Sequence, residues 1–136
     1  MKYSFLLIGE KTESMWPLVV EQALSSLGIF QMALEEQAVD LAAGNHYDVI
    51  MLDSATVRDP VGLISKLRSQ QPEVKIVVVT ASPTWQRARE ALQAGADDYF
   101  RKSLDVTQIR SKIQALLAGN LESEQRPGAE EGKPSN

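Results

Sequence analysis

The chain has 136 residues and a formal net charge of −4, with 43% hydrophobic and 24% charged residues. A chain of this length forms one domain that buries roughly two thirds of the surface exposed by its unfolded form, and this composition is typical of an ordinary globular protein. The acidic balance argues against direct binding of nucleic acid, and the absence of cysteine excludes disulfides, thiolate nucleophiles and sulfur-ligated metal sites.

Five short segments of four to six residues are predicted to be β-strands, because the first four are rich in aliphatic residues and the fifth ends in two aromatic residues, Tyr99 and Phe100. They cover residues 3–8, 29–34, 48–52, 75–79 and 97–100. The third and fourth runs are almost wholly aliphatic, so we expect both strands to be buried near the centre of a sheet.

Five segments with a helical period alternate with these strands, at about residues 14–27, 36–43, 61–70, 83–94 and 106–117. In the first segment Pro17 fits only the first turn, and Gly28 is expected to end the helix. Ser82 and Gly95 are the expected N-cap and C-terminal stop of the fourth, and Asp105 is the expected cap of the fifth. The alternation predicts an α/β fold with a parallel sheet covered on both faces.

The composition changes from Gly119 onward, where one aliphatic residue larger than alanine remains. Such a segment cannot bury enough apolar surface to order itself. We therefore predict a globular domain over residues 1–119 and a flexible acidic tail or linker over residues 120–136.

Three polar residues stand at the ends of predicted strands: Asp53, Thr80 and Lys102. The carboxyl ends of parallel strands meet at one edge of a sheet, where ligands of such folds bind. A carboxylate, a hydroxyl and an ammonium group gathered there predict a phosphoryl site.

Three stretches, at residues 47–53, 77–81 and 94–102, together resemble the receiver domain of two-component response regulators. The resemblance covers about residues 3–118. It implies a three-layer, flavodoxin-like (βα)5 fold with a doubly wound, five-stranded parallel sheet in the order 2-1-3-4-5.

The resemblance also implies a role for each polar residue. Asp53 would accept a phosphoryl group from a sensor histidine kinase, Thr80 would donate its hydroxyl to that group, and Lys102 would supply a fixed positive charge. Tyr99 matches the aromatic switch position of the family. Phosphorylation would then draw Thr80 inward and change the shape of a protein-interaction surface.

A magnesium ion is implied as well, held by Glu10, Asp53 and the backbone carbonyl of Ala55. The chain departs from the family pattern around this site. Receivers usually carry two acidic residues after the first strand, and here Gly9 precedes Glu10. The loop after Asp53 is about one residue longer than usual, and Ser103 replaces a proline, so its peptide bond need not be cis.

These departures keep a second interpretation open, in which the domain is a degenerate receiver that binds partners without phosphate control. Other classes fit less well. A flavodoxin-type FMN site needs an uncharged phosphate loop where Glu10 and Glu13 stand, and no G-x-G-x-x-G motif indicates a dinucleotide enzyme. An aspartyl phosphatase needs a second Asp where Ala55 stands, so we expect only self-catalysed phosphoryl acceptance and autodephosphorylation.

The expected partners are a sensor kinase or phosphotransfer protein and a downstream effector protein or domain, with a homodimer possible by resemblance. No apolar run approaches the ~18 residues of a membrane helix, and residues 1–9 lack a signal-peptide pattern. We expect a cytoplasmic domain that binds neither membrane nor nucleic acid directly. The sequence does not identify the cognate kinase, the signal or the output.

Overall fold

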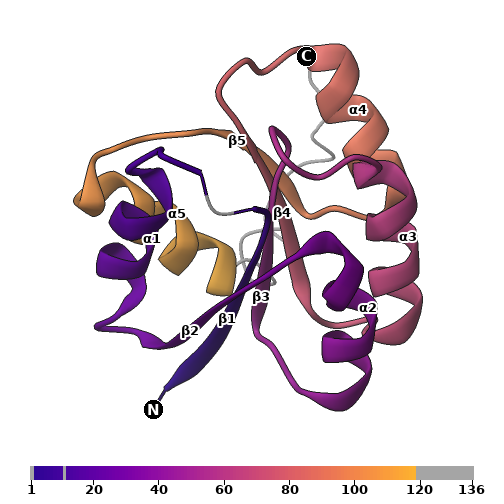
Figure 1. Ribbon diagram of the computed structural model, residues 1–136, viewed down its shortest axis with the longest axis horizontal. Coiled ribbons are helices and arrows are strands. Elements are labelled where there is room, and N and C mark those ends of the chain that lie inside the picture. Colours follow the sequence, from indigo (N-terminus) through magenta and orange to yellow (C-terminus); the bar gives the residue numbers. More distant parts are fainter. Residues whose placement is uncertain (1, 11, 119–136) are drawn as a thin grey trace.

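The computed structural model describes residues 2–10 and 12–118, over which five strands and five helices alternate. All strand pairs are parallel, and the sheet order is β2-β1-β3-β4-β5 (Figure 1). The predicted fold class is therefore confirmed, whereas the predicted tail over 120–136 lies outside the described residues. The elements are β1 (Tyr3–Ile8), α1 (Trp16–Leu24), β2 (Gly28–Ala33), α2 (Glu35–Gly44), β3 (Val49–Asp53), α3 (Pro60–Gln70), β4 (Lys75–Thr80), α4 (Trp85–Ala94), β5 (Asp98–Arg101) and α5 (Val106–Leu117).

Helices cover both faces of the sheet, with α1 and α5 on one side and α2, α3 and α4 on the other (Figure 1). Alternate side chains of each strand enter different cores, because successive residues of a strand point to opposite faces. In β1, Phe5 and Leu7 pack with α1 and α5, whereas Leu6 and Ile8 pack with the other helices. Every residue of the central strand β3 is buried, as the aliphatic run predicts.

The strand ends differ slightly from prediction in a way that bears on the site. Asp53 and Thr80 are the last residues of β3 and β4, rather than the first residues after them. The first helix is shorter than expected, because the chain turns after Leu24 with the Leu27 amide donating to the Leu24 carbonyl. Gly28 is therefore not a helix stop but the first residue of β2.

The N-cap of α4 is Thr84, so the prediction of Ser82 was wrong. The Thr84 side chain accepts a hydrogen bond from the Arg87 amide at 3.2 Å, whereas the Ser82 amide donates to the Thr80 hydroxyl. Gly95 ends α4 with a φ of +124°, a conformation that favours glycine. Asp105 caps α5 as predicted, accepting from two backbone amides of its first turn.

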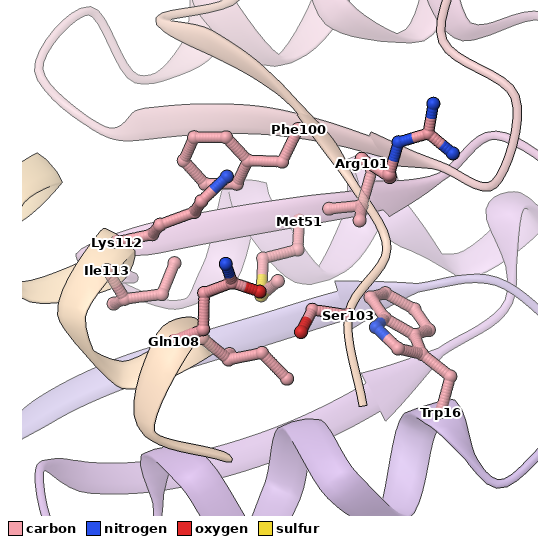
Figure 2. A pocket seen from close by; sticks show the side chains of 10 residues that line it. Trp16, Met51, Phe100, Arg101, Ser103, Gln108, Lys112 and Ile113 are labelled. Carbon is pink, nitrogen blue, oxygen red and sulfur yellow. The ribbon is translucent and has the colours of Figure 1, made fainter. Parts of the chain in front are cut away.

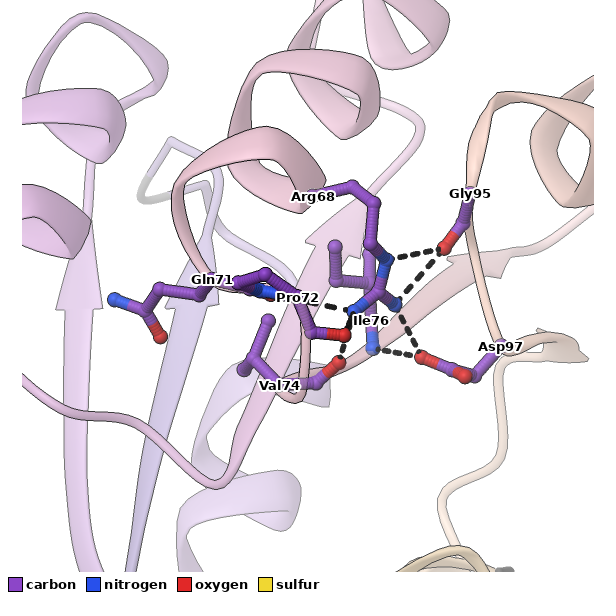
Figure 3. A network of polar contacts seen from close by, with 7 residues as sticks. All are labelled: Arg68, Gln71, Pro72, Val74, Ile76, Gly95 and Asp97. Atoms are coloured by element: carbon purple, nitrogen blue, oxygen red, sulfur yellow. Dashed lines mark hydrogen bonds and ion pairs between the residues drawn. The ribbon is translucent and has the colours of Figure 1, made fainter.

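Arg68 of α3 joins the end of its own helix to the α3–β4 connection and to the α4–β5 connection (Figure 3). Its guanidinium donates to the Gly95 carbonyl at 3.1 and 2.9 Å and pairs with the Asp97 carboxylate at 2.6 Å. Asp97 in turn accepts from the Ile76 amide at 2.8 Å. The remaining acceptors are carbonyl oxygens of the α3–β4 connection, at Gln71, Pro72 and Val74.

Tyr47, just before β3, is buried with 3% of its surface exposed, and its hydroxyl donates to Gln31 at 2.8 Å. Burial raises the pKa of Tyr47 above its usual value. Because the folded protein holds the hydroxyl proton more tightly than the unfolded chain, this proton contributes fully to stability below about pH 10, the pKa of an unfolded tyrosine. The contribution is lost as the pH rises through the pKa of Tyr47 in the folded protein. We expect Tyr47→Phe to lower the free energy of unfolding by about 1 kcal/mol at neutral pH.

The difference in free energy of unfolding between the wild type and Tyr47→Phe should shrink above about pH 10, because only the wild type carries a buried hydroxyl that can lose its proton. Urea denaturation of both proteins at neutral and alkaline pH measures this. The same pH dependence of stability in both proteins would contradict this prediction.

Among the described residues, no helix combines the length and the apolar character that crossing a membrane requires.

Candidate functional site

Asp53 and Thr80 are the buried polar or charged residues of the part of the chain that the structure describes, each with 5% of its surface exposed. They end two neighbouring strands, since Asp53 pairs with Val79 in the parallel register of β3 and β4. The Ser54 amide donates to the Val79 carbonyl and continues this pairing past the strand end. Burial of a carboxylate costs free energy unless it is paired, so a partner is expected nearby.

Lys102, directly after β5, is that partner. Its Nζ lies 2.9 Å from Asp53 Oδ1, and the two side chains expose only 17% and 8% of their surface. The Lys102 amide donates to the Thr80 carbonyl at 2.8 Å, which places the lysine beside the end of β4. The structure thus brings together the three residues that the sequence placed at one sheet edge.

Trp16, at the start of α1, is a neighbour that the sequence did not predict. Lys102 Nζ lies 4.7 Å from the centre of its ring, so the ammonium sits between an aromatic face and the Asp53 carboxylate. Trp16 also borders a small apolar cavity of about 20 Å³ together with Phe100 and Ser103 (Figure 2). The cavity has room for about one water molecule, so it is no ligand pocket, but it leaves space beside the Lys102 segment.

The hydroxyl of Thr80 is oriented by the backbone of the loop that follows β4. Its oxygen accepts a hydrogen bond from the Ser82 amide at 3.1 Å. A hydroxyl that accepts still has its proton to donate. Thr80 can therefore donate toward a negatively charged group bound next to Asp53.

The loop after β3 folds tightly around Asp53. The Ala55 amide donates to Asp53 Oδ1 at 3.0 Å, and the Thr56 and Val57 amides donate to the Asp53 carbonyl. The hydrogen bond from Ala55 and the ion pair with Lys102 both involve Oδ1 of Asp53. Oδ2 has no polar partner within the described ranges 2–10 and 12–118. One carboxylate oxygen is thus held in place while the other is available.

Gly9 and Glu10 follow β1 at the same edge. Gly9 is buried and its amide donates to Ala33, whereas Glu10 is exposed and its amide donates to the Thr56 hydroxyl at 3.0 Å. Thr56 was missed by sequence reasoning, although the altered loop length after Asp53 was the signal that this loop is unusual. No group of three His, Cys, Asp or Glu side chains suited to a metal occurs in the described residues.

Tyr99 lies in β5 with its side chain half-buried on the face of α2, α3 and α4, opposite to Trp16. It lines a groove with Ser54 and Val57 of the β3–α3 loop and Ala91 of α4. A movement of the loop that follows Asp53 would therefore change the shape of the groove that Tyr99 lines. No cis peptide bond is present in the described chain, which includes the Lys102–Ser103 bond.

Residues 18–114 match the family of response regulator receiver domains. The chain belongs to this family. The receiver matches two curated relatives over part of their length. It is 39% identical over 62 residues to the transcriptional regulatory protein PhoP of Escherichia coli strain K12, covering 46% of this chain and 28% of that protein. It is 34% identical over 83 residues to the two-component response regulator PhoP of Pseudomonas aeruginosa, covering 60% of this chain and 37% of that protein.

A solved structure supports the same fold. The CheY-like receiver domain protein of Methanospirillum hungatei JF-1 superimposes on the receiver with a TM-score of 0.77 and 17% sequence identity, covering 90% of this chain and 99% of the other. The predicted receiver fold is confirmed. The family match begins after β1, so it does not include Gly9 and Glu10.

Proposed function

We propose that this receiver accepts a phosphoryl group on Asp53 from a sensor histidine kinase or a phosphotransfer protein. One observation carries the proposal: Asp53 is a buried carboxylate with Oδ1 fixed 2.9 Å from Lys102 Nζ and with Oδ2 available. Lys102 offsets part of the charge repulsion between a carboxylate and an incoming phosphoryl group. Thr80 would donate its hydroxyl to a phosphoryl oxygen.

The receiver family typically binds Mg²⁺, and the donor atoms at this edge suit that ion. Mg²⁺ keeps several water molecules and is usually held by one or two carboxylates. Asp53 Oδ2, the exposed carboxylate of Glu10 and the backbone carbonyl of Ala55 would hold it here. When bound, the ion screens the charge between Asp53 and the phosphoryl group.

The proposed switch follows from these contacts. Thr80 and Lys102 gain their full interactions only with a phosphorylated Asp53, so phosphorylation would favour an arrangement in which both close on that group. Tyr99, next to the loop after Asp53, would change its position with them. The surface of α4, β5 and α5 would then bind a downstream effector protein or domain, or a second copy of the chain. We place this signalling in the cytoplasm.

The second candidate is a degenerate receiver that binds its partners without phosphorylation. Gly9 favours it, because one carboxylate of the usual acidic pair is missing. The ion pair between Lys102 and Asp53 also satisfies the buried carboxylate without any phosphoryl group. Because the chain spans 28% and 37% of the two PhoP relatives, the output of the whole protein is not proposed from them.

Incubation with Mg²⁺ and acetyl phosphate separates the two candidates. We expect the mass of the wild-type chain to increase by one phosphoryl group that hydroxylamine removes, because an acyl phosphate on a carboxylate is sensitive to this nucleophile. NMR signals of Thr80, Tyr99 and Lys102 should shift on addition of a beryllofluoride salt. Asp53→Asn should abolish both responses, because the amide neither accepts the phosphoryl group nor carries the charge.

A matched control is Asp59→Asn, a change of the same kind in the same loop at a residue that caps α3. It should leave phosphorylation intact. A wild-type chain that shows neither the added mass nor the shifts would favour the degenerate receiver. Turnover of an external phosphate ester that requires Mg²⁺ and Asp53 would show an enzyme, and would contradict the expectation that Asp53 only accepts a phosphoryl group and loses it again.

A further inference from the structure

The space next to Gly9 is already filled by Thr56. A Cβ atom on Gly9 would lie 2.8 Å from Thr56 Oγ1 and 3.0 Å from Asp53 Cβ. Real Cβ atoms essentially never approach another atom more closely than 3.0 Å. An acidic side chain at position 9 is therefore incompatible with the present position of the Thr56 hydroxyl.

Thr56 also connects the two loops that carry the proposed metal ligands. Its Oγ1 accepts a hydrogen bond from the Glu10 amide at 3.0 Å, and its own amide donates to the Asp53 carbonyl at 3.1 Å. Because Oγ1 is the acceptor in the first bond, the hydroxyl proton is still available for another oxygen.

The Thr56 hydroxyl borders the same space as the available oxygen of Asp53. The position that a Gly9 Cβ would take lies 2.8 Å from Thr56 Oγ1 and 3.7 Å from Asp53 Oδ2. A hydroxyl with a free proton thus stands where the family pattern places the side chain of a second carboxylate.

We propose that Thr56 takes the place of the missing carboxylate and lines the divalent-cation site, where its hydroxyl donates to the water shell of Mg²⁺. This inference rests on the proposed function. A hydroxyl binds water but adds no negative charge, and Mg²⁺ retains several waters in protein sites. The receiver therefore keeps a complete lining around Asp53 with one negative charge fewer.

The first test measures Mg²⁺ affinity of the full chain through the fluorescence of Trp16, whose ring faces Lys102. Because Trp85 is the second tryptophan and is exposed, all variants carry Trp85→Phe. Thr56→Val removes the bond that Oγ1 accepts from the Glu10 amide as well as the proposed bond to the water shell, so it should weaken Mg²⁺ binding roughly ten- to a hundredfold. Thr56→Ser, which keeps the hydroxyl, should bind as the unaltered site does. Thr107→Val, the same change on the exposed surface of α5, is the matched control.

The second test is a double-mutant cycle between positions 9 and 56. Gly9→Asp alone should lower the melting temperature, because its Cβ collides with Thr56 Oγ1. Gly9→Asp with Thr56→Ala should recover melting temperature relative to Gly9→Asp and bind Mg²⁺ about tenfold more tightly than the wild type, since it restores a carboxylate. The two substitutions should therefore be strongly non-additive.

Equal Mg²⁺ affinity of Thr56→Val and the wild type would overturn the inference, as would no binding of Mg²⁺ by the wild type. Additive effects on melting temperature and Mg²⁺ affinity would overturn it too. Failure of the proposed function is distinct: the wild type would then bind Mg²⁺ with the expected Thr56 dependence and gain no phosphoryl group on Asp53.

Discussion

Replacement of Arg68 by alanine is expected to lower the free energy of unfolding by about 3 kcal/mol. The guanidinium pairs with Asp97 at 2.6 Å and donates to carbonyl oxygens of the connections that follow α3 and α4, those of Val74 and Gly95 (Figure 3). Its removal takes the charged partner away from the Asp97 carboxylate, which keeps the Ile76 amide, and takes the side-chain donor away from several carbonyl groups. The loss should exceed that of a surface ion pair, because three chain segments depend on one side chain.

Chemical denaturation of the wild type and Arg68→Ala measures this change. Arg68→Lys should recover only part of the loss, because one ammonium group cannot reproduce the planar fork of donors. Arg87→Ala is the matched control, since Arg87 is exposed on α4, and it should change stability by no more than about 0.5 kcal/mol. A comparable effect of both alanine substitutions would contradict the importance of the Arg68 network.

Replacement of Lys102 by methionine is expected to weaken the binding of beryllofluoride in the presence of Mg²⁺ roughly ten- to hundredfold. A hydrogen bond to a charged group contributes about 1.5–3 kcal/mol, and each 1.4 kcal/mol corresponds to about a factor of ten. Methionine keeps most of the length and apolar volume of the lysine side chain, whereas the charge that lies next to Asp53 and over the Trp16 ring is lost.

Calorimetric titration with beryllofluoride measures the loss, and the NMR signals of Thr80 and Tyr99 show whether the switch still follows binding. Lys66→Met is the matched control, because Lys66 is exposed on α3. Its beryllofluoride affinity should equal that of the wild type. Unchanged affinity in Lys102→Met would contradict the role proposed for the Lys102 ammonium group.

Local sequence patterns located the elements well, because strand and helix formation follow from short-range hydrophobic periodicity. The aliphatic run at residues 49–52 indicated a strand buried on both faces, and β3 is the central strand. Helix ends were less predictable. Ser82 and Thr84 are both good N-cap residues, and the choice depends on the Ser82 amide bonding to Thr80 across the β4–α4 loop.

The proximity of Asp53, Thr80 and Lys102 was predictable because it follows from topology: parallel strands deliver their carboxyl ends to one edge. The neighbours of this trio were not. Trp16 reaches Lys102 from the start of α1, and Arg68 reaches Asp97 across 29 positions of sequence. Such contacts depend on how loops and helices pack on the sheet, which no local pattern records.

By itself the sequence determined the alternation of elements, the kind of sheet and the three polar strand ends, because each depends on residue type and spacing. Only the tertiary structure decided how the departure at Gly9 is accommodated. The reason is steric: Thr56 Oγ1 lies 2.8 Å from where a Gly9 Cβ would be, although the two residues are 47 positions apart in the chain. What reads in the sequence as a missing carboxylate is in the folded chain a filled position next to Asp53.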